Sequence, residues 1–340
     1  MITLTWQRIR MAPATPFRTA KAVRTEKETL WTKLQSEGVV GWGEAVPMDT
    51  YGQTLDSAET TLKSVAKSLE GRNPRHIEDI TSELVHGYDD QLATVAAIDA
   101  ALHDWVGKKY GISTVEWLGL DPTRIPLTSF TIGIADRDAV AEKVRTASEF
   151  PIFKVKVGIP EGDAALSTIR ATAPAKMIRV DANMGWTADQ ALSELPRLKE
   201  MGVEFVEQPV ASNDLDGLKR LKDAAIVPIV ADESCVRPCD VLRVAGRVDG
   251  INIKLSKCGG IRQGLKMIHL ARAHGLKIML GCMIESSLGI SAAAQLAPLV
   301  DWLDLDGHLL LANDPFTGLG GRSGRLTIGG GPGLGVTPCN

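Results

Sequence analysis

Five charged residues recur along the second half of the sequence at a nearly constant interval. Lys156, Asp181, Glu207, Asp232 and Lys257 are separated by 25, 26, 25 and 25 positions. Taken alone, each carboxylate could cap a helix and each lysine could be a surface residue. Charges are costly to bury unless they pair or bind a metal, so five in phase indicate one shared site.

The residue types in this series favour a particular chemistry. Three carboxylates without histidine or cysteine form an all-oxygen ligand set, which suits one Mg²⁺ ion, or Mn²⁺, better than zinc. Asp181, Glu207 and Asp232 are therefore the predicted metal ligands. Lys154 shares a strand face with Lys156, and two close ammonium groups beside a dication should lower each other's pKa. A neutral amine could then remove the weakly acidic proton next to a substrate carboxylate, while the metal stabilises the enolate.

The elements that position these charges show a regular alternation. Eight short apolar runs are each expected to be a strand: Leu127–Ile132, Ile152–Val157, Met177–Val180, Val203–Val206, Pro228–Ala231, Ile251–Leu255, Lys277–Leu280 and Trp302–Leu305. The segments between them have the length and composition of helices. Strand and helix alternating about every 25 residues predict an α/β fold, specifically a closed parallel barrel, with an open doubly wound sheet as the alternative. Barrel active sites lie at the carboxyl ends of the strands, where the charged series falls.

The first part of the chain has a different pattern. Leu30–Gln35 and Val39–Trp42 are expected strands, and Leu92–Lys109 has apolar residues at helical spacing. Strands followed by helices predict an α+β unit, and Leu120–Thr123, which contains a proline, is the expected boundary.

Bulk properties exclude several classes of protein. The net charge of -3 gives no basic field for nucleic acid. The sequence has no apolar span of membrane length and no secretory signal at its start. Its five scattered cysteines suit reduced thiols, so a cytoplasmic location is expected.

These residues resemble the enolase superfamily, its muconate-lactonizing subgroup, and within that the dipeptide epimerases. The matching segments are Lys154-Val155-Lys156, Val180-Asp181-Ala182-Asn183, Glu207-Gln208-Pro209, Ala231-Asp232-Glu233-Ser234 and Lys257-Cys258-Gly259-Gly260, with Gly41-Trp42-Gly43-Glu44 and 96–111 outside the site. The resemblance implies a (β/α)₇β modified TIM barrel, residues 123–320, under an α+β capping domain. That domain would comprise residues 1–122, with the C-terminal 321–340 packing back on it. One departure is Gln53, where relatives often carry glutamate.

The expected mechanism uses two lysine bases. Lys156 would serve one face of the α-carbon and Lys257 the other, because the second and sixth strands lie across the barrel from each other. Lys154 would tune Lys156 and touch the substrate carboxylate. The product would be a dipeptide epimerised at its C-terminal residue.

Substrate contacts are expected at further positions. Asp304 and Asp306 share a strand face and would hold a substrate ammonium, although they could instead pair with barrel lysines or cap a short helix. The resemblance implies that Thr131 and the segment from Cys282 to Ile284 line the dipeptide backbone. It also implies that Arg24 meets an acidic side chain, with Lys21 and Arg18 close enough to compete for that role.

The resemblance makes L-Ala-D/L-Glu the expected substrate. Rival activities on the same scaffold are muconate cycloisomerase, o-succinylbenzoate synthase and N-succinylamino acid racemase, and a barrel that only binds a ligand is a rival from another class. A homo-oligomer is possible, since relatives often form one.

Overall fold

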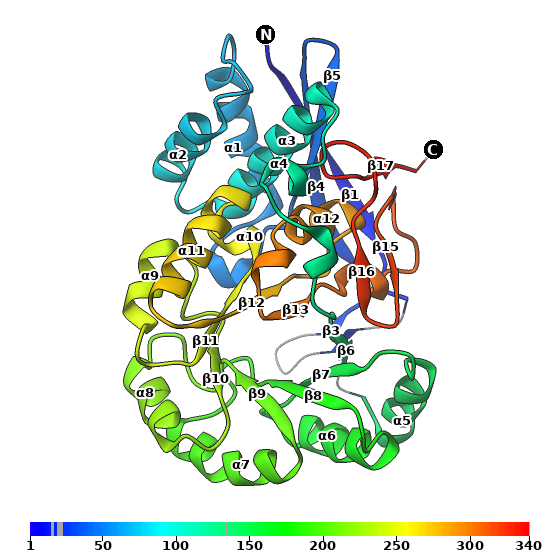
Figure 1. The fold of residues 1–340 in the computed structure, drawn as a ribbon, viewed down its shortest axis with the longest axis vertical. Coiled ribbons are helices and arrows are strands. Elements are labelled where there is room, and N and C mark those ends of the chain that lie inside the picture. Colours follow the sequence, from blue (N-terminus) through cyan, green and yellow to red (C-terminus); the bar gives the residue numbers. More distant parts are fainter. Residues whose placement is uncertain (15–16, 19–22, 134, 340) are drawn as a thin grey trace.

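The computed structural model describes residues 1–14, 17–18, 23–133 and 135–339, without the side chains of residues 17, 18, 23, 24 and 160. Figure 1 shows two layers of the molecule, with the N-terminal elements above a barrel formed by the rest of the chain. The C-terminal segment returns to the upper part, beside the N-terminal sheet.

The barrel contains eight parallel strands in sequence order. They are β6 (Phe130–Ile132), β7 (Ile152–Lys156), β8 (Met177–Asp181), β9 (Val203–Glu207), β10 (Ile229–Ala231), β11 (Gly250–Ile253), β12 (Lys277–Gly281) and β13 (Trp302–Asp304). A parallel bridge between Thr128 and Leu303 brings the last strand against the chain that leads into the first. The eight expected strands and the closed barrel are confirmed, and the open sheet is not what the chain forms.

Helices connect the strands and cover the outside of the barrel. They are α5 (Arg137–Thr146), α6 (Pro160–Thr172), α7 (Ala188–Glu200), α8 (Leu215–Ala224), α9 (Pro238–Val244), α10 (Leu255–Cys258), α11 (Ile261–Ala273) and α12 (Ser287–Ala294), with 3₁₀ turns at Ala297–Leu299 and Gly307–Leu310. Capping residues in the sequence fix where these helices begin. In α7, the Thr187 hydroxyl accepts from the Gln190 N–H and the Gln190 side chain accepts from the Thr187 N–H, which satisfies two helix-end donors.

The lower interior of the barrel is filled by large side chains, with Phe205 packed against Trp302 at 4.7 Å between ring centroids. Among them Arg179 donates to Glu204 Oε2 at 2.8 Å and to the Leu303 carbonyl at 2.9 Å. The register of β8 and β9 shifts between Ile178 and Val180, next to this pair. The barrel is therefore a packed core that leaves its upper end to form a site.

In the described part of the chain, the capping elements comprise a three-stranded sheet, a short two-stranded hairpin and four helices. The sheet has the order β1 (Thr3–Met11), β4 (Lys27–Ser36), β5 (Val39–Ala45), and a separate hairpin pairs β2 (Phe17–Arg18) with β3 (Val23–Arg24). The helices are α1 (Leu55–Ser68), α2 (Ile77–Gly87), α3 (Leu92–Tyr110) and α4 (Thr114–Trp117), with 3₁₀ turns at Asp49–Tyr51 and Pro122–Arg124.

Helix α3 packs closely on β5 because two glycines allow it. A Cβ at Gly41 would lie 2.0 Å from the Ala101 carbonyl oxygen, and one at Gly43 would lie 1.9 Å from that of Ala97. Gln53 holds the start of α3, where its side-chain oxygen accepts from the Ala93 N–H at 3.0 Å. The departure noted at Gln53 thus has a structural role at a helix N-terminus.

The C-terminal segment contains β14 (Phe316–Thr317), β15 (Gly320–Arg322), β16 (Arg325–Thr327) and β17 (Thr337–Pro338). It contacts α3 through Asp104, whose carboxylate accepts from the Leu334 N–H at 2.9 Å and from the Trp42 N–H at 2.8 Å. The domain boundary expected near residue 122 stays a prediction. No helix in the described part of the chain has the length and apolar character needed to cross a membrane.

Candidate active site

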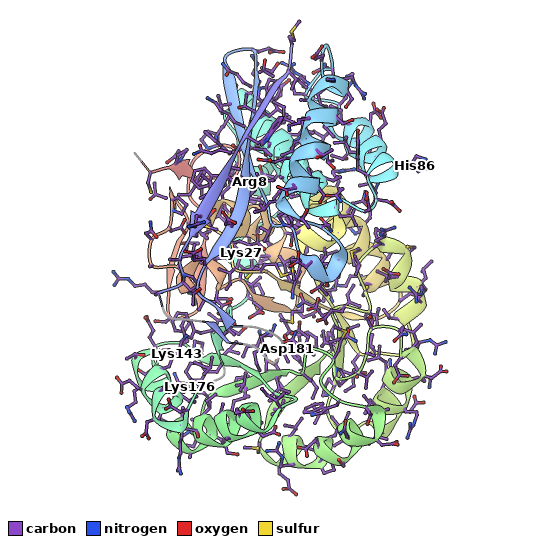
Figure 2. All side chains as sticks on the ribbon, turned by 180° about the vertical axis from the view of Figure 1, so that it is seen from behind. Arg8, Lys27, His86, Lys143, Lys176 and Asp181 are labelled. Carbon is purple, nitrogen blue, oxygen red and sulfur yellow. The ribbon has the colours of Figure 1, made fainter. Side chains whose placement is uncertain are left out.

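A cavity of about 190 Å³ lies where the capping elements meet the carboxyl ends of the barrel strands. Figure 2 shows Asp181 on the side of the barrel that faces the cap. The cap contributes Lys27, Met48, Thr50 and Tyr51 to the lining. The barrel contributes Thr131, Lys154, Lys156, Asn183, Asp232, Glu233, Lys254, Cys282, Met283, Ile284, Asp304, Asp306, Gly307 and Leu310.

Three buried carboxylates stand at the ends of neighbouring strands. Asp181 and Glu207 pair in the register of β8 and β9, and Asp232 follows β10 directly. Burial, and then the negative charge of Asp181, raise the pKa of Glu207 to about 7. Burial opposes ionisation of Asp232 too, but Lys254 and Lys257 outweigh it and lower the pKa of Asp232. The structure thus brings together the three predicted metal ligands.

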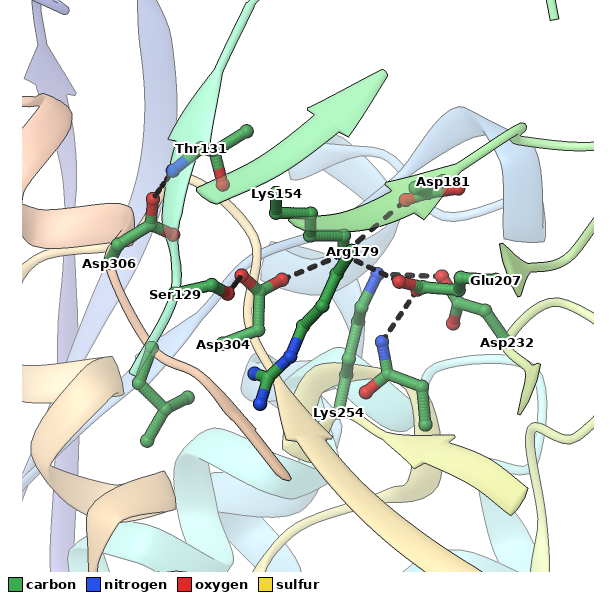
Figure 3. Close-up of polar contacts among 12 residues, drawn as sticks. Ser129, Thr131, Lys154, Arg179, Asp181, Glu207, Asp232, Lys254, Asp304 and Asp306 are labelled. Atoms are coloured by element: carbon green, nitrogen blue, oxygen red, sulfur yellow. Dashed lines mark hydrogen bonds and ion pairs between the residues drawn. The ribbon is translucent and has the colours of Figure 1, made fainter. Parts of the chain in front are cut away.

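Lys154 lies at the centre of the polar cluster, as Figure 3 shows. Its ammonium group is 2.7 Å from Asp304 Oδ2, 2.7 Å from Glu207 Oε2 and 3.4 Å from Asp181 Oδ2. Burial alone would lower the pKa of Lys154, but these carboxylates raise it well above its usual value. The expected lowering of the pKa is therefore wrong for Lys154, because its three acidic neighbours outweigh burial.

The two lysines that border the cavity on opposite strands are Lys156 and Lys254. Lys156 ends β7 and its Nζ is 2.5 Å from Asp181 Oδ2. Lys254 follows β11 directly, and its Nζ is 2.7 Å from Asp232 Oδ2. Sequence reasoning missed Lys254 because the expected strand Ile251–Leu255 included it, whereas β11 ends at Ile253.

Lys257 does not occupy the position predicted for it. It lies in α10, one turn beyond Lys254, and is 1% exposed without lining the cavity. Its ammonium group donates to the carbonyl oxygens of Asp232 at 2.8 Å and Asn252 at 3.0 Å, and to Asp232 Oδ1. The structure therefore does not place Lys257 at the cavity, where it was expected, because the chain turns after β11 and carries this side chain behind Asp232.

Asp304 and Asp306 both line the cavity but have different partners. Asp304 accepts from Lys154 at 2.7 Å and from the Ser129 hydroxyl at 2.5 Å, so the alternative of pairing with a barrel lysine holds for this residue. Asp306 accepts from the Thr131 N–H at 2.6 Å and, among the described residues, has no ion pair with a lysine or arginine. Burial and the nearby Asp304 raise the pKa of Asp306 to about 6.

The other predicted substrate residues are placed in part. Thr131, Cys282 and Ile284 line the cavity, as expected from their positions on β6 and after β12. Arg24 belongs to β3, but its side chain and that of Arg18 lie outside the described residues, as does Lys21 entirely.

The carboxylate trio fits a hard divalent cation by its chemistry. Glu207 Oε2 is buried and has no hydrogen-bond partner among the described residues, although Lys154 lies close enough for an ion pair. In the same part of the chain, no three acidic, histidine or cysteine side chains already converge as a metal-binding group. The ammonium groups of Lys154, Lys156 and Lys254 contact oxygens of the three carboxylates. A dication could take the place of these ammonium groups.

Comparison with known proteins shows similarity along the whole chain. The model of the mandelate racemase/muconate lactonizing enzyme N-terminal domain matches residues 1–119, and that of the enolase C-terminal domain-like family matches residues 136–340. The L-Ala-D/L-Glu epimerase of Bacteroides thetaiotaomicron is 41% identical over 323 residues, which cover 94% of this chain and 84% of that protein.

Two solved structures are similar in fold and length. One is a substrate-liganded complex of the L-Ala-D/L-Glu epimerase from Bacillus subtilis, with a TM-score of 0.94 and 31% identity. The other is the dipeptide epimerase from Enterococcus faecalis V583 complexed with Mg and the dipeptide L-Leu-L-Tyr, with a TM-score of 0.93 and 32% identity. Each comparison covers 99% of this chain and 99% of the other.

Proposed function

Because the chain belongs to the mandelate racemase/muconate lactonizing enzyme family of the enolase superfamily, we propose that it is a dipeptide epimerase. It is an isomerase that inverts the α-carbon of the C-terminal residue by removing and returning a proton. The observation that carries this proposal is the pair of lysines, Lys156 and Lys254, that border one cavity from opposite strands.

The two lysines act as bases on opposite faces of the α-carbon. In an eight-stranded barrel the second and sixth strands, β7 and β11, are half a turn apart, so Lys156 and Lys254 approach from opposite sides. One amine accepts the α-proton and the other ammonium group delivers a proton to the opposite face, which inverts the configuration. Lys254 replaces Lys257 in this role because its ammonium group lies at the cavity.

The carboxylate of the substrate is directed toward Asp181, Glu207 and Asp232. When bound there, Mg²⁺ would supply positive charge that stabilises the enolate formed after proton removal. Lys154 contributes a fixed positive charge at the same place, since its buried ammonium group touches two of these ligands. No proton transfer is assigned to Lys154.

Asp306 recognises the ammonium group of the dipeptide. Its pKa of about 6 and its lack of an ion pair in the described part of the chain mean that a cationic partner would stabilise its charged form. Asp304 is already engaged by Lys154 and Ser129, so Asp306 carries most of this contact. N-acylated and amine-free substrates lack the positive charge, which disfavours an N-succinylamino acid racemase and an o-succinylbenzoate synthase respectively.

The preferred substrate is L-Ala-D/L-Glu. The similarity to the epimerase of Bacteroides thetaiotaomicron supports this choice, and Arg24 is assigned to the side-chain carboxylate of the glutamate. Cys282 and Ile284 contact the dipeptide backbone from the barrel side of the cavity.

A panel of substrates tests the proposal. The metal-loaded enzyme is incubated with L-Ala-L-Glu, L-Ala-L-Leu, N-succinyl-L-Glu and N-acetyl-L-Glu, and epimer formation is followed by chiral chromatography. We expect L-Ala-L-Glu to be the best substrate and both N-acyl amino acids to react far more slowly. Faster turnover of an N-acyl amino acid would exclude the ammonium contact and with it the dipeptide assignment.

A further inference from the structure

Each of the three clustered carboxylates has one oxygen held by a donor that belongs to the protein framework. Oδ1 of Asp181 accepts from the backbone N–H of Asn183 at 2.9 Å. Oε1 of Glu207 accepts from the side-chain amide of Asn252 at 2.7 Å, and Oδ1 of Asp232 accepts from the ammonium group of Lys257. The three donors differ in type but engage one oxygen each.

The second oxygen of each carboxylate contacts a lysine that lines the cavity. Asp181 Oδ2 faces Lys156, Glu207 Oε2 faces Lys154 and Asp232 Oδ2 faces Lys254, at 2.5, 2.7 and 2.7 Å. A divalent cation that replaces these ammonium groups would therefore meet one oxygen from each carboxylate.

Lys257 is fixed firmly enough to maintain this arrangement. Besides the Asp232 side chain, its ammonium group contacts the carbonyl oxygens of Asp232, Asn252 and Cys235 at 2.8, 3.0 and 3.4 Å. Asp232 and Cys235 follow β10, and Asn252 lies on the neighbouring strand β11. The side chain of Lys257 is 1% exposed. Turning Asp232 so that both oxygens face the cavity would leave the buried ammonium group of Lys257 with carbonyl acceptors only and without a counter-charge, which is costly.

Asn252 is held at its own position by close packing. A Cβ on Gly281 of the neighbouring strand would lie 2.6 Å from Asn252 Oδ1, so this glycine gives the amide its space. The amide is fully buried and its nitrogen points at Glu207.

We propose that Lys257 and Asn252 make the site selective for Mg²⁺ over Ca²⁺ by limiting Asp232 and Glu207 to one ligand oxygen each. This inference rests on the metal site of the proposed function. Mg²⁺ requires near-octahedral coordination by few protein ligands, whereas Ca²⁺ takes six to eight oxygens and often binds a carboxylate through both. Lys257 is thus a positioning residue that acts through Asp232.

The charge of Lys257 has an effect that must be separated from its position. Removing a positive charge close to the site strengthens binding of Mg²⁺ and Ca²⁺ together, because both ions carry the same charge. Freeing the second oxygen of Asp232 favours Ca²⁺ alone. The ratio of the two dissociation constants therefore reports positioning, while their common change reports charge.

The test uses the full chain, stripped of metal and without substrate. Binding of Mg²⁺ and of Ca²⁺ is measured by isothermal titration calorimetry for the wild type and for the variants Lys257→Met and Asn252→Leu. Each substitution keeps the size of the side chain and removes its hydrogen-bond donor. The exposed lysine variant Lys63→Met is the matched control. We expect Kd(Ca²⁺)/Kd(Mg²⁺) to fall by about tenfold or more in both donor variants and to stay constant in the control.

Two results would overturn the inference, and a third would also exclude the proposed function. If the ratio changes less than twofold in Lys257→Met while both affinities rise together, Lys257 acts by charge alone. If Lys257→Met does not fold, an unchanged ratio in Asn252→Leu is equally decisive. If wild type binds neither cation, the metal site itself fails, and the proposed function fails with it.

Discussion

Replacing Glu285 by glutamine should remove a pH-dependent loss of stability at the junction of cap and barrel. Glu285 is buried next to Glu44, which reaches from β5 to accept hydrogen bonds from Ser286 and Gly289 at the start of α12. Burial, and then the charge of Glu44, raise the pKa of Glu285 to about 7, against 4.5 as its usual value, while Lys27 and Lys254 lower it by less. Above pH 7 the folded protein must therefore hold the charge of Glu285 in a buried position beside Glu44, a carboxyl whose pKa burial also raises.

The magnitude follows from the two pKa values. Below pH 4.5 Glu285 is protonated in the folded and unfolded chain, and it imposes no penalty. As the pH rises toward 7 the unfolded chain releases its proton first, so stability falls; the penalty is about 1 kcal/mol at pH 5 and about 3 kcal/mol at pH 8. Glutamine stays neutral and keeps the acceptor for the Met283 N–H.

Urea unfolding, followed by tryptophan fluorescence at pH 5 and pH 8, provides the measurement. The free energy of unfolding of Glu285→Gln should exceed that of wild type at pH 8 by about 2 kcal/mol more than it does at pH 5. His308 and Asp306 are present in wild type and variant alike, so the difference reports the charge of Glu285 together with its effect on the neighbouring Glu44. Glu70→Gln, at an exposed position in the cap, is the control. An equal difference at both pH values would refute the reasoning.

Three further predictions concern the active site. Asp306→Asn should lower kcat/KM for free dipeptides at least about 100-fold, since the ammonium group loses a charged, buried acceptor; steady-state kinetics check this, and an effect below fivefold would contradict it. Chelation should abolish turnover and added Mg²⁺ restore it, and full activity in a metal-free sample would exclude the metal role. Arg24→Ala should reduce kcat/KM for L-Ala-L-Glu at least about tenfold more than for L-Ala-L-Leu, in parallel assays; equal losses would remove Arg24 from side-chain recognition.

The barrel and its carboxylates could be predicted because both depend on local, repeated patterns. Apolar runs alternating with helices define the strands, and Asp181, Glu207 and Asp232 each stand at or just after a strand end. Parallel strands in a barrel bring their carboxyl ends to one place, so position along the chain determined position in space.

The second lysine could not be chosen by counting. The interval of 25 residues selected Lys257, whereas Lys254 stands directly after β11 and reaches the cavity. The first turn of α10 separates the two, and Lys257 meets Asp232 from the buried side while Lys254 meets it at the cavity. Equal spacing along a sequence does not measure orientation, which depends on where the strand ends.

Contacts between distant parts of the chain could not be predicted from the sequence either. Asp304 pairs with Lys154, 150 positions earlier, and with Ser129 where the barrel closes. The sequence indicates that both aspartates share a face, but only the closed barrel shows that Asp304 pairs with Lys154 while Asp306 has no ion pair with a lysine or arginine among the described residues.

The most direct test of two-base epimerisation is α-proton exchange in deuterium oxide, followed by proton NMR with each epimer of Ala-Glu. The wild-type enzyme should exchange the α-proton of both epimers for deuterium and should interconvert the two epimers. Lys156→Ala and Lys254→Ala should each fail to epimerise, and each should exchange the α-proton of one epimer only, the opposite one in the two variants. Lys257→Met should still epimerise and exchange both. Epimerisation at the normal rate by Lys254→Ala, or exchange of the same epimer by both alanine variants, would contradict the account.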